Sequence, residues 1–364
     1  MIKQLKTFTV NMVAGANVAV VVGMLAAGYS DLVSPASFPA LVFLGMTFPV
    51  FLLLNLGFLL FWVTFKWRKI WIPLLGFALA YVPISIYMPL NLAKDIPDDA
   101  LKIVSYNVCS YGGNYKYDDG FGTVYDYLAE QKADIVCLQE DNDTWRRYVM
   151  LRYEKIYPYN DTTVFSKQPT SMNGVGIHTR FPILRKERID YESSANGSVA
   201  YYLQIGKDTV IVINNHLECT HLSSEDRTRY KDMLRGEMGR DTVKSESKLI
   251  IGKLGVAAAD RAPQAEAVHR YVDEHSQYPI IVCGDFNDTP ISYSRRIVSK
   301  GLTDCFVEAG RGVGLSYNQK GFFFRIDHIF CSSHFEPLKC VIDDKFDASD
   351  HYPVVCWLKI HDNP

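Results

Sequence analysis

The sequence predicts a membrane anchor of three transmembrane helices followed by a mixed α/β layered domain. Two observations support this prediction. Long uncharged, apolar stretches are confined to the first quarter of the 364-residue chain, whereas the remainder alternates short β-rich runs with helical patterns and long loops. We therefore expect residues 1–93 to form the anchor, 94–101 a short linker and 102–360 the layered domain.

The anchor is predicted from charge-free stretches. There are three of them, at residues 7–30, 32–65 and 70–93. Each exceeds the roughly 20 apolar residues that are needed to cross the hydrocarbon core of a membrane. The middle stretch is longer than one span requires, and we place its crossing part at 40–64. Because Lys3 and Lys6 precede the first stretch, a cleaved signal peptide is an alternative there, but the two later spans favour a retained helix.

The orientation is predicted from basic residues in the short loops. Lys3 and Lys6 precede the first span, whereas the loop between the first two spans holds only Asp31. The loop between the second and third spans is basic, with Lys66, Arg68 and Lys69. Basic loops remain in the cytoplasm. The N-terminus should therefore be cytoplasmic, and the layered domain extracytoplasmic, in the periplasm or outside the cell.

Charge and cysteine content limit the function of the layered domain. Residues 1–93 carry a net charge of +4, so the chain total of −2 leaves −6 for the rest. This acidic balance disfavours a general nucleic-acid binder, although a local basic groove is left open. All eight cysteines follow residue 94, and several, such as Cys137 and Cys283, lie in apolar runs. Buried free thiols are favoured over disulfides, and the absence of a C-x-x-C pair argues against zinc.

The layered domain is predicted from seven β-rich runs and three helical patterns. The runs are 102–106, 135–138, 174–177, 210–213, 280–283, 326–330 and 354–357. The helical patterns cover about 119–131, 223–256 and 261–275. Ser223 is suited to cap the second helix, and Pro263 is expected to start the third.

Six segments place polar or ionisable residues next to these apolar strands, where loops and active sites gather. They contain Asn107, Glu140, His216, Asp285 with Asn287, Asp327, and Asp350 with His351. The carboxylate of Glu140 and the amide oxygen of Asn107 are ligand types that suit magnesium. Asp285 and Asn287 are two residues apart, so in extended backbone they point to the same side. His351 can act as a general acid or base, with Asp327 fixing its tautomer.

In combination and order, these six segments resemble the endonuclease/exonuclease/phosphatase superfamily, which includes deoxyribonucleases, neutral sphingomyelinases and inositol polyphosphate 5-phosphatases. The resemblance covers about residues 100–360. It implies a four-layer α/β/β/α sandwich with its active site at one end, and a phosphoesterase that uses Mg²⁺, with Mn²⁺ as the alternative. Residues 102–360 would then be the catalytic domain.

The resemblance also implies a role for each residue. Asn107, Glu140 and Asp350 would lie near the metal, with Glu140 as the principal ligand. Asp285 would orient or activate the attacking water, Asn287 would hold the phosphate, and His216 would contact it in the transition state. Asp327 would pair with His351. Thr179-Arg180 resembles a family signature that usually has a serine at the position of Thr179.

The substrate stays open between a lipid phosphodiester, a small soluble ester and a nucleic acid, which the acidic charge disfavours. A catalytically silent membrane sensor or scaffold is the alternative of another class, and the oligomeric state is unknown. Residues 219–261 form an insertion that is either a lid, a substrate-selecting wall or a solvated surface helix. The short linker would hold the domain against the bilayer, which favours a lipid head group or another surface-confined ester. Because the linker enters at the start of the first strand, however, an upright domain would direct its site away from the membrane, and lipid access would require the domain to lie on its side. We therefore expect a small or surface-associated ester.

Overall fold

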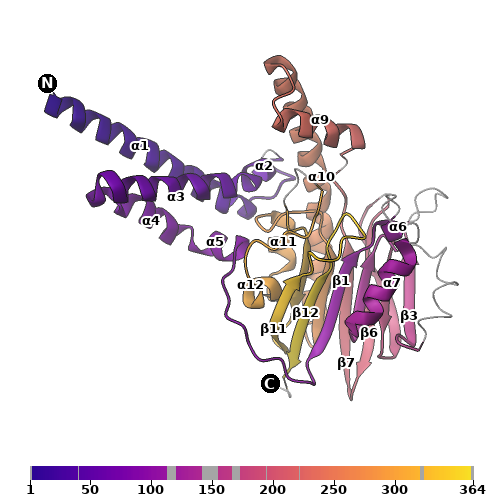
Figure 1. The fold of residues 1–364 in the computed structure, drawn as a ribbon. Coiled ribbons are helices and arrows are strands. Elements are labelled where there is room, and N and C mark those ends of the chain that lie inside the picture. Colours follow the sequence, from indigo (N-terminus) through magenta and orange to yellow (C-terminus); the bar gives the residue numbers. More distant parts are fainter. Residues whose placement is uncertain are drawn as a thin grey trace.

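The computed structural model describes residues 2–39, 41–112, 120–141, 155–165, 173–193, 195–220, 222–319 and 324–361. A bundle of N-terminal helices lies against one end of a β-sandwich (Figure 1). Residues 2–39 and 41–112 form the helical bundle and the start of the sandwich, and the described residues after them form the remainder of the sandwich.

Within these described residues, two six-stranded sheets lie face to face, flanked by helices on both outer sides (Figure 1). The first sheet, in spatial order, is β11 (Phe335–Ile342), β12 (Val354–Ile360), β1 (Leu101–Asn107), β2 (Ile135–Gln139), β4 (Gly174–Thr179) and β3 (Tyr159–Val164). The second is β5 (Ile183–Ile189), β6 (Gly197–Ile205), β7 (Asp208–His216), β8 (Ile280–Asp285), β10 (Asp327–Cys331) and β9 (Thr303–Asp304). The predicted four-layer sandwich is confirmed.

Alternating side chains on each strand build the layers, as the two-residue period of a strand requires. In β1, Ile103 faces the core between the sheets, whereas Val104 and Tyr106 face the outer layer with α7. In β7, Val212 faces the inner core and Ile213 packs in the outer layer with α10. The helices and helical turns of this domain are α6 (Cys109–Gly112), α7 (Gly120–Gln131), α9 (Ser224–Leu234), α10 (Arg240–Glu274), α11 (Tyr293–Val298) and α12 (Cys305–Ala309).

All seven predicted strands are present, but five further strands, β3, β5, β6, β9 and β11, were not predicted. The predicted helix start at Pro263 is wrong, because α10 continues through this residue. A proline inside a helix removes the hydrogen bond to the carbonyl four residues earlier and crowds that carbonyl with its ring. Here Pro263 is exposed and Ala259 is half-buried, so solvent can satisfy that carbonyl. All eight cysteines are free thiols and six of them are buried, as the sequence favoured.

The anchor differs from three simple spans. It comprises α1 (Ile2–Gly28), η1 (Ser30–Leu32), α2 (Leu41–Met46), α3 (Phe48–Phe65), η2 (Trp67–Lys69), α4 (Trp71–Leu79) and α5 (Tyr81–Tyr87). In the described residues, two helices are long and apolar enough to cross a membrane, or three if the bent pair α4–α5 is one span. This pair bends by 63°. Pro83 has no N–H for the Leu79 carbonyl, and the Tyr29 hydroxyl donates to that carbonyl instead.

The chain between the anchor and the sandwich follows a path that reverses the orientation of an upright domain. Helix α5 ends at Tyr87, and the chain from Met88 to Ala100 runs back along the sandwich to the start of β1 (Figure 1). Asn91 donates to the carbonyls of Val307 and Gly310, and Lys94 pairs with Glu336 at 3.1 Å. The anchor therefore contacts the end of the sandwich where β1 ends. The expectation that this end points away from the anchor is wrong.

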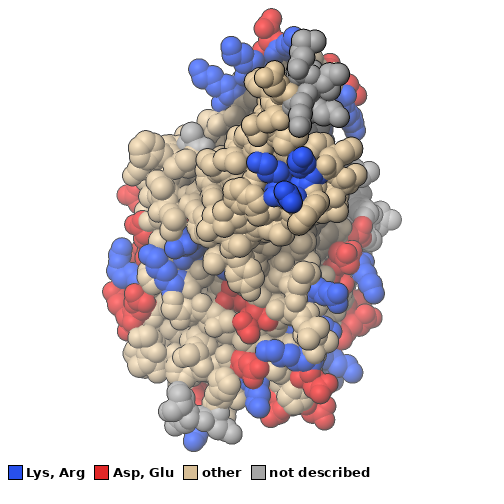
Figure 2. Space-filling view, turned by 90° about the vertical axis from the view of Figure 1, so that its left-hand side faces the viewer, with Lys and Arg blue, Asp and Glu red and all other residues tan. Residues whose placement is uncertain are grey.

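Side chains from both parts join the anchor to the sandwich. Ile291, in the loop after β8, is buried in an apolar cluster with Met24 and Phe48 of the anchor. Arg296 forms an ion pair with the buried Asp31 at 3.4 Å. At the opposite end of the bundle, Figure 2 shows a group of basic side chains on an otherwise uncharged surface. Lys66 precedes η2 there, and η2 contains Arg68 and Lys69.

Candidate active site

The polar ends of the strands meet at one edge of the sandwich because the central strands of each sheet are parallel. β1 pairs with β2, and β7 with β8, so their carboxyl ends lie side by side. β10 runs antiparallel to β8, and its first residue, Asp327, lies opposite Asp285 in register. His216 lies opposite Asp285 on the other side. Sequence-distant residues are thus brought within a few ångströms of one another.

Asp285 is the centre of this arrangement. Its Oδ2 accepts a hydrogen bond from Nδ2 of Asn107 at 3.0 Å, and its Oδ1 accepts from the backbone N–H of Asn287 at 2.8 Å. The Nε2 atoms of His216 and His351 each lie 3.7 Å from Oδ2. Asp285 is 1% exposed. Burial raises the pKa of Asp285, while the neighbouring His351 acts in the opposite direction.

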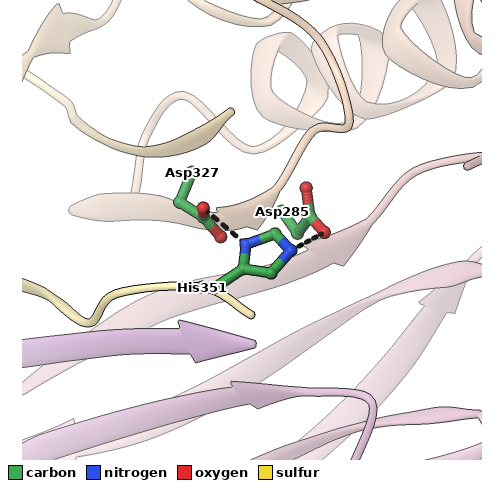
Figure 3. Close-up of side chains that lie close together, drawn as sticks. All are labelled: Asp285, Asp327 and His351. Atoms are coloured by element: carbon green, nitrogen blue, oxygen red, sulfur yellow. Dashed lines mark hydrogen bonds and ion pairs between the residues drawn. The ribbon is translucent and has the colours of Figure 1, made fainter. Parts of the chain in front are cut away.

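His351 and Asp327 form a hydrogen-bonded pair, with Nδ1 of the imidazole 2.8 Å from Oδ2 of the carboxylate (Figure 3). The backbone N–H of Asp327 donates to Oγ of Ser316, which anchors the start of β10. Burial of the imidazole opposes its charged form, but the Asp327 and Asp285 carboxylates outweigh it and raise the pKa of His351 well above its ordinary value. The pair therefore stabilises an imidazolium at neutral pH.

His216 is held differently, although it faces the same carboxylate. Its Nδ1 lies 3.1 Å from Oδ1 of Asn173, and the ring is 2% exposed. Burial lowers the pKa of His216, and Asp285 only partly offsets this effect. The two imidazoles on either side of Asp285 are consequently in different states at neutral pH, His216 neutral and His351 charged.

Glu140 and Asp350 provide a second acidic centre beside the first. Burial raises the pKa of Glu140, and the carboxylate of Asp350 raises it further. Glu140 also has a positive φ of 53°, a conformation that non-glycine residues rarely adopt and that is found at functional sites. Two carboxylates held together in this way are destabilised as anions, and a divalent cation between them would relieve that repulsion.

Asn107 links the two acidic centres. Its Nδ2 donates to Glu140 Oε1 at 3.2 Å as well as to Asp285, while its Oδ1 accepts from the backbone N–H of Cys109. In this orientation the amide nitrogen, and not the oxygen, faces the carboxylates. Rotation of the amide by 180° exchanges the two atoms without moving the residue. The role of Asn107 as an oxygen ligand stays a prediction.

A second group also has the geometry of a metal site. Ligand atoms of Asp285, Asp327 and His351 lie within 4.8 Å of one another (Figure 3). An imidazolium has no free lone pair for a metal, however, and the two carboxylates favour this form of His351. The donor set of Glu140 and Asp350 is therefore the better fit for a hard divalent cation.

The backbone next to Asp285 is also constrained. Gly284 has a φ of 133°, and a Cβ there would meet the Asn215 carbonyl oxygen at 2.0 Å. Only glycine allows β7 and β8 to approach each other in this way. Asn287 follows with a φ of 50°, and its Nδ2 donates to the Leu217 carbonyl at 3.1 Å.

A cavity of about 200 Å³ opens onto these groups. Of the eight predicted site residues, six line it: Glu140, His216, Asp285, Asn287, Asp350 and His351. Asn107 and Asp327 lie behind this lining and contact Asp285 and His351, respectively. Arg180, in the predicted family signature, is elsewhere, paired with Asp134 at the opposite end of β4.

Some residues of the site were not predicted from the sequence. Arg227 and Tyr317 line the cavity, with the Arg227 guanidinium 5.9 Å from the centre of the Tyr317 ring. Asn173 and Ser316 position His216 and Asp327. Arg227, Tyr317 and Ser316 do not adjoin a predicted strand, which was the signal that identified the others, whereas Asn173 directly precedes the predicted strand 174–177 and could have been found by it.

Comparisons with known proteins identify the fold and the family. No curated protein sequence matches the chain. Residues 10–87 match a domain of unknown function, DUF8431. Three solved structures share the fold, each with a TM-score of 0.50. The catalytic domain of human nocturnin with bound sulfate is 15% identical, over 74% of this chain and 98% of that chain. TDP2 of D. rerio, complexed with a single-strand DNA product, is 17% identical over 72% and 100%.

The third structure, an endonuclease/exonuclease/phosphatase from Beutenbergia cavernae DSM 12333, is 16% identical over 72% of each chain. At these identities the likeness shows the fold alone. The sequence match is more specific, because residues 104–351, more than half of the chain, match the Endonuclease/Exonuclease/phosphatase family. These residues include every predicted site residue. The chain belongs to the endonuclease/exonuclease/phosphatase family.

Proposed function

We propose that this protein is a membrane-anchored phosphoesterase that hydrolyses a phosphate ester by attack of water and depends on Mg²⁺ or Mn²⁺. Members of its family are hydrolases of phosphate esters, and the fold supports phosphodiesterase or nuclease activity. The observation that carries the proposal is the position of the buried Asp285 between two imidazoles, with Nε2 of His216 and Nε2 of His351 each 3.7 Å from its Oδ2. A silent sensor would have no need to retain this arrangement of buried ionisable groups.

In the proposed reaction, Asp285 orients the attacking water and accepts its proton. Its raised pKa brings its basicity closer to that required of a general base. The imidazolium of His351, held by Asp327, stabilises negative charge on the phosphoryl oxygens, and His216 contacts them from the other side of Asp285. Asn287, whose backbone N–H fixes Asp285, holds a phosphate oxygen.

Glu140 and Asp350 would hold the divalent cation, with Asn107 beside them. When bound, the cation neutralises charge on the phosphate. The raised pKa of Glu140 supports this role, because a carboxylate that is costly to ionise alone gains the most from a cation.

We propose residues 1–93 as the anchor, 94–101 as the linker and 102–360 as the catalytic domain, which faces the extracytoplasmic side. The basic residues of η2 support this orientation, because they lie at the end of the bundle that is remote from the sandwich (Figure 2). The anchor places the site beside the membrane, whichever ester is the substrate.

The test is hydrolysis by the full-length protein in detergent micelles, with bis(4-nitrophenyl) phosphate, 4-nitrophenyl phosphate and a single-stranded oligonucleotide as substrates. A chelator should abolish turnover, and Mg²⁺ or Mn²⁺ should restore it. Asp285→Asn and His351→Ala should each lower kcat by at least about 10²-fold. Full activity in both variants would contradict the proposal, and a marked preference for the oligonucleotide would favour the nuclease alternative.

A further inference from the structure

One wall of the active-site cavity is apolar and comes from elements outside the catalytic strands. Val42, Phe43 and Met46 of α2 line it, together with Ile250 and Leu254 of α10. The catalytic carboxylates and imidazoles line the same cavity. The cavity therefore combines charged groups, which suit a phosphate, with an apolar side, which does not.

One side of this apolar wall, α2, belongs to the membrane anchor. Thr47 is the only residue between α2 and α3, and α3 is one of the helices that are apolar enough to cross a membrane. α2 lies at the end of the bundle where α1 ends and α3 begins, next to the sandwich (Figure 1). If α1 and α3 cross the membrane, α2 is at its surface, at the depth of lipid head groups.

Docking of the anchor on the sandwich accounts for only part of this wall. α2 packs against α10, and the two parts are also joined at Ile291, at Asp31–Arg296 and by the approach of Pro39 to Gly255. Phe43 remains 42% exposed although it lines the cavity. A large apolar side chain that is held beside a phosphate site, but not buried by its own protein, can be covered by an apolar part of the ligand.

We propose that the substrate is a phosphate ester carried on a membrane lipid, whose chain leaves the catalytic groups along the α2–α10 wall. This inference rests on the proposed function and specifies its substrate class. The phosphate lies at Asp285 and His351, and Arg227, on the same cavity, faces the head group. The first part of the chain contacts Val42 and Phe43, and the rest remains in the bilayer, so the lipid need not leave the membrane completely.

The experiment compares two 4-nitrophenyl phosphodiesters that differ only in their alkyl group, ethyl or hexadecyl. The leaving group is the same, so a rate difference reports on contacts of the chain. Full-length protein in detergent micelles should show a higher kcat/KM for the hexadecyl ester. Phe43→Ala should lower the ratio of the two kcat/KM values roughly tenfold, because contacts that one large apolar group makes in a pocket are worth about this much.

Phe38→Ala is the matched control. Phe38 lies five residues from Phe43, is 64% exposed and is not among the residues that line the cavity. The Phe38→Ala substitution removes the same type of exposed side chain from the anchor, and it therefore controls for altered partition of the ester into micelles. The ratio should be unchanged in Phe38→Ala. Equal ratios in the wild type and both variants, or an equal fall in both, would overturn the lipid inference while leaving hydrolysis of the ethyl ester intact.

A second readout does not depend on turnover. A hexadecyl phosphate with a photoreactive group near the phosphate end of its chain is crosslinked to the Asp285→Asn protein, and the modified residues are located by mass spectrometry. We expect crosslinks at Val42, Phe43 or Leu254 that excess inorganic phosphate reduces. Crosslinks confined to the outer faces of α1 and α3, insensitive to phosphate, would overturn the inference. Crosslinks in the cavity without hydrolysis of either ester would overturn only the proposed function.

Discussion

The charge of Asp327 is predicted to determine the pH range in which the enzyme is active. In Asp327→Asn, the amide oxygen can still accept a hydrogen bond from Nδ1 of His351, but the negative charge is lost. At 2.8 Å and an effective dielectric constant of 20, the attraction between carboxylate and imidazolium is about 6 kcal/mol. A neutral hydrogen bond retains about 1 kcal/mol of this. We expect a loss of 10²–10³-fold in kcat, about 3–4 kcal/mol, which is less than the attraction that the substitution removes.

The sign of the pH effect follows from the two carboxylates that raise the pKa of His351. The imidazolium is present below the pKa of the folded protein, so activity should fall as the pH rises through that value. Removal of one carboxylate lowers the pKa, and the alkaline limb of the profile should move to lower pH. The assay is kcat/KM for bis(4-nitrophenyl) phosphate as a function of pH, with metal at saturation.

Asp343→Asn provides the control for this measurement. Asp343 is not among the residues that line the cavity. Its carboxylate accepts a hydrogen bond from the Tyr127 hydroxyl at 2.9 Å, and an amide oxygen can accept it too. This variant should keep both the rate and the profile. A lower rate in Asp327→Asn with an unshifted alkaline limb would refute the electrostatic reasoning, because it would mean that Asp327 acts only through the structure.

Three further outcomes are expected. Glu140→Gln should raise the Tm of the metal-free protein at pH 7 and abolish the increase in Tm with Mg²⁺. Because the pKa of Glu140 is raised in the folded protein, the protein loses stability as the pH rises toward that pKa, and a neutral amide avoids this loss. An equal Mg²⁺ response in wild type and variant, measured by thermal unfolding, would exclude Glu140 as a ligand. Arg227→Ala should lower kcat/KM for an anionic ester roughly tenfold, with partial recovery in Arg227→Lys, whereas an unchanged value would remove Arg227 from the site. A membrane-impermeant maleimide should label the exposed Cys219 in intact cells. In a Cys219→Ser background, it should label Trp67→Cys only after the cells are permeabilised. The reverse pattern would show that the topology is inverted.

Much of the catalytic domain could be predicted from the sequence because its signals are local. Apolar runs that are buried on both faces, such as β2 and β8, are evident without any partner strand. A carboxylate at the end of such a run, as at Glu140 or Asp285, is costly unless the fold uses it, so the site residues were conspicuous. Edge strands were missed for the converse reason: β3 and β5 are half-exposed and polar, and only their neighbours in the sheet make them strands.

The tertiary structure decided how the parts face each other. Residue patterns located the apolar helices of the anchor, but they carry no information on where α5 ends or on the path of Met88–Ala100 along the sandwich. That path depends on long-range contacts, such as Asn91 with Val307, between residues more than 200 positions apart. It brings α2 to the active-site cavity and gives the cavity its apolar wall. The sequence by itself therefore determined the chemistry of the site, since burial of charge is a local conflict, whereas its placement beside the anchor arose from contacts that only the folded chain creates.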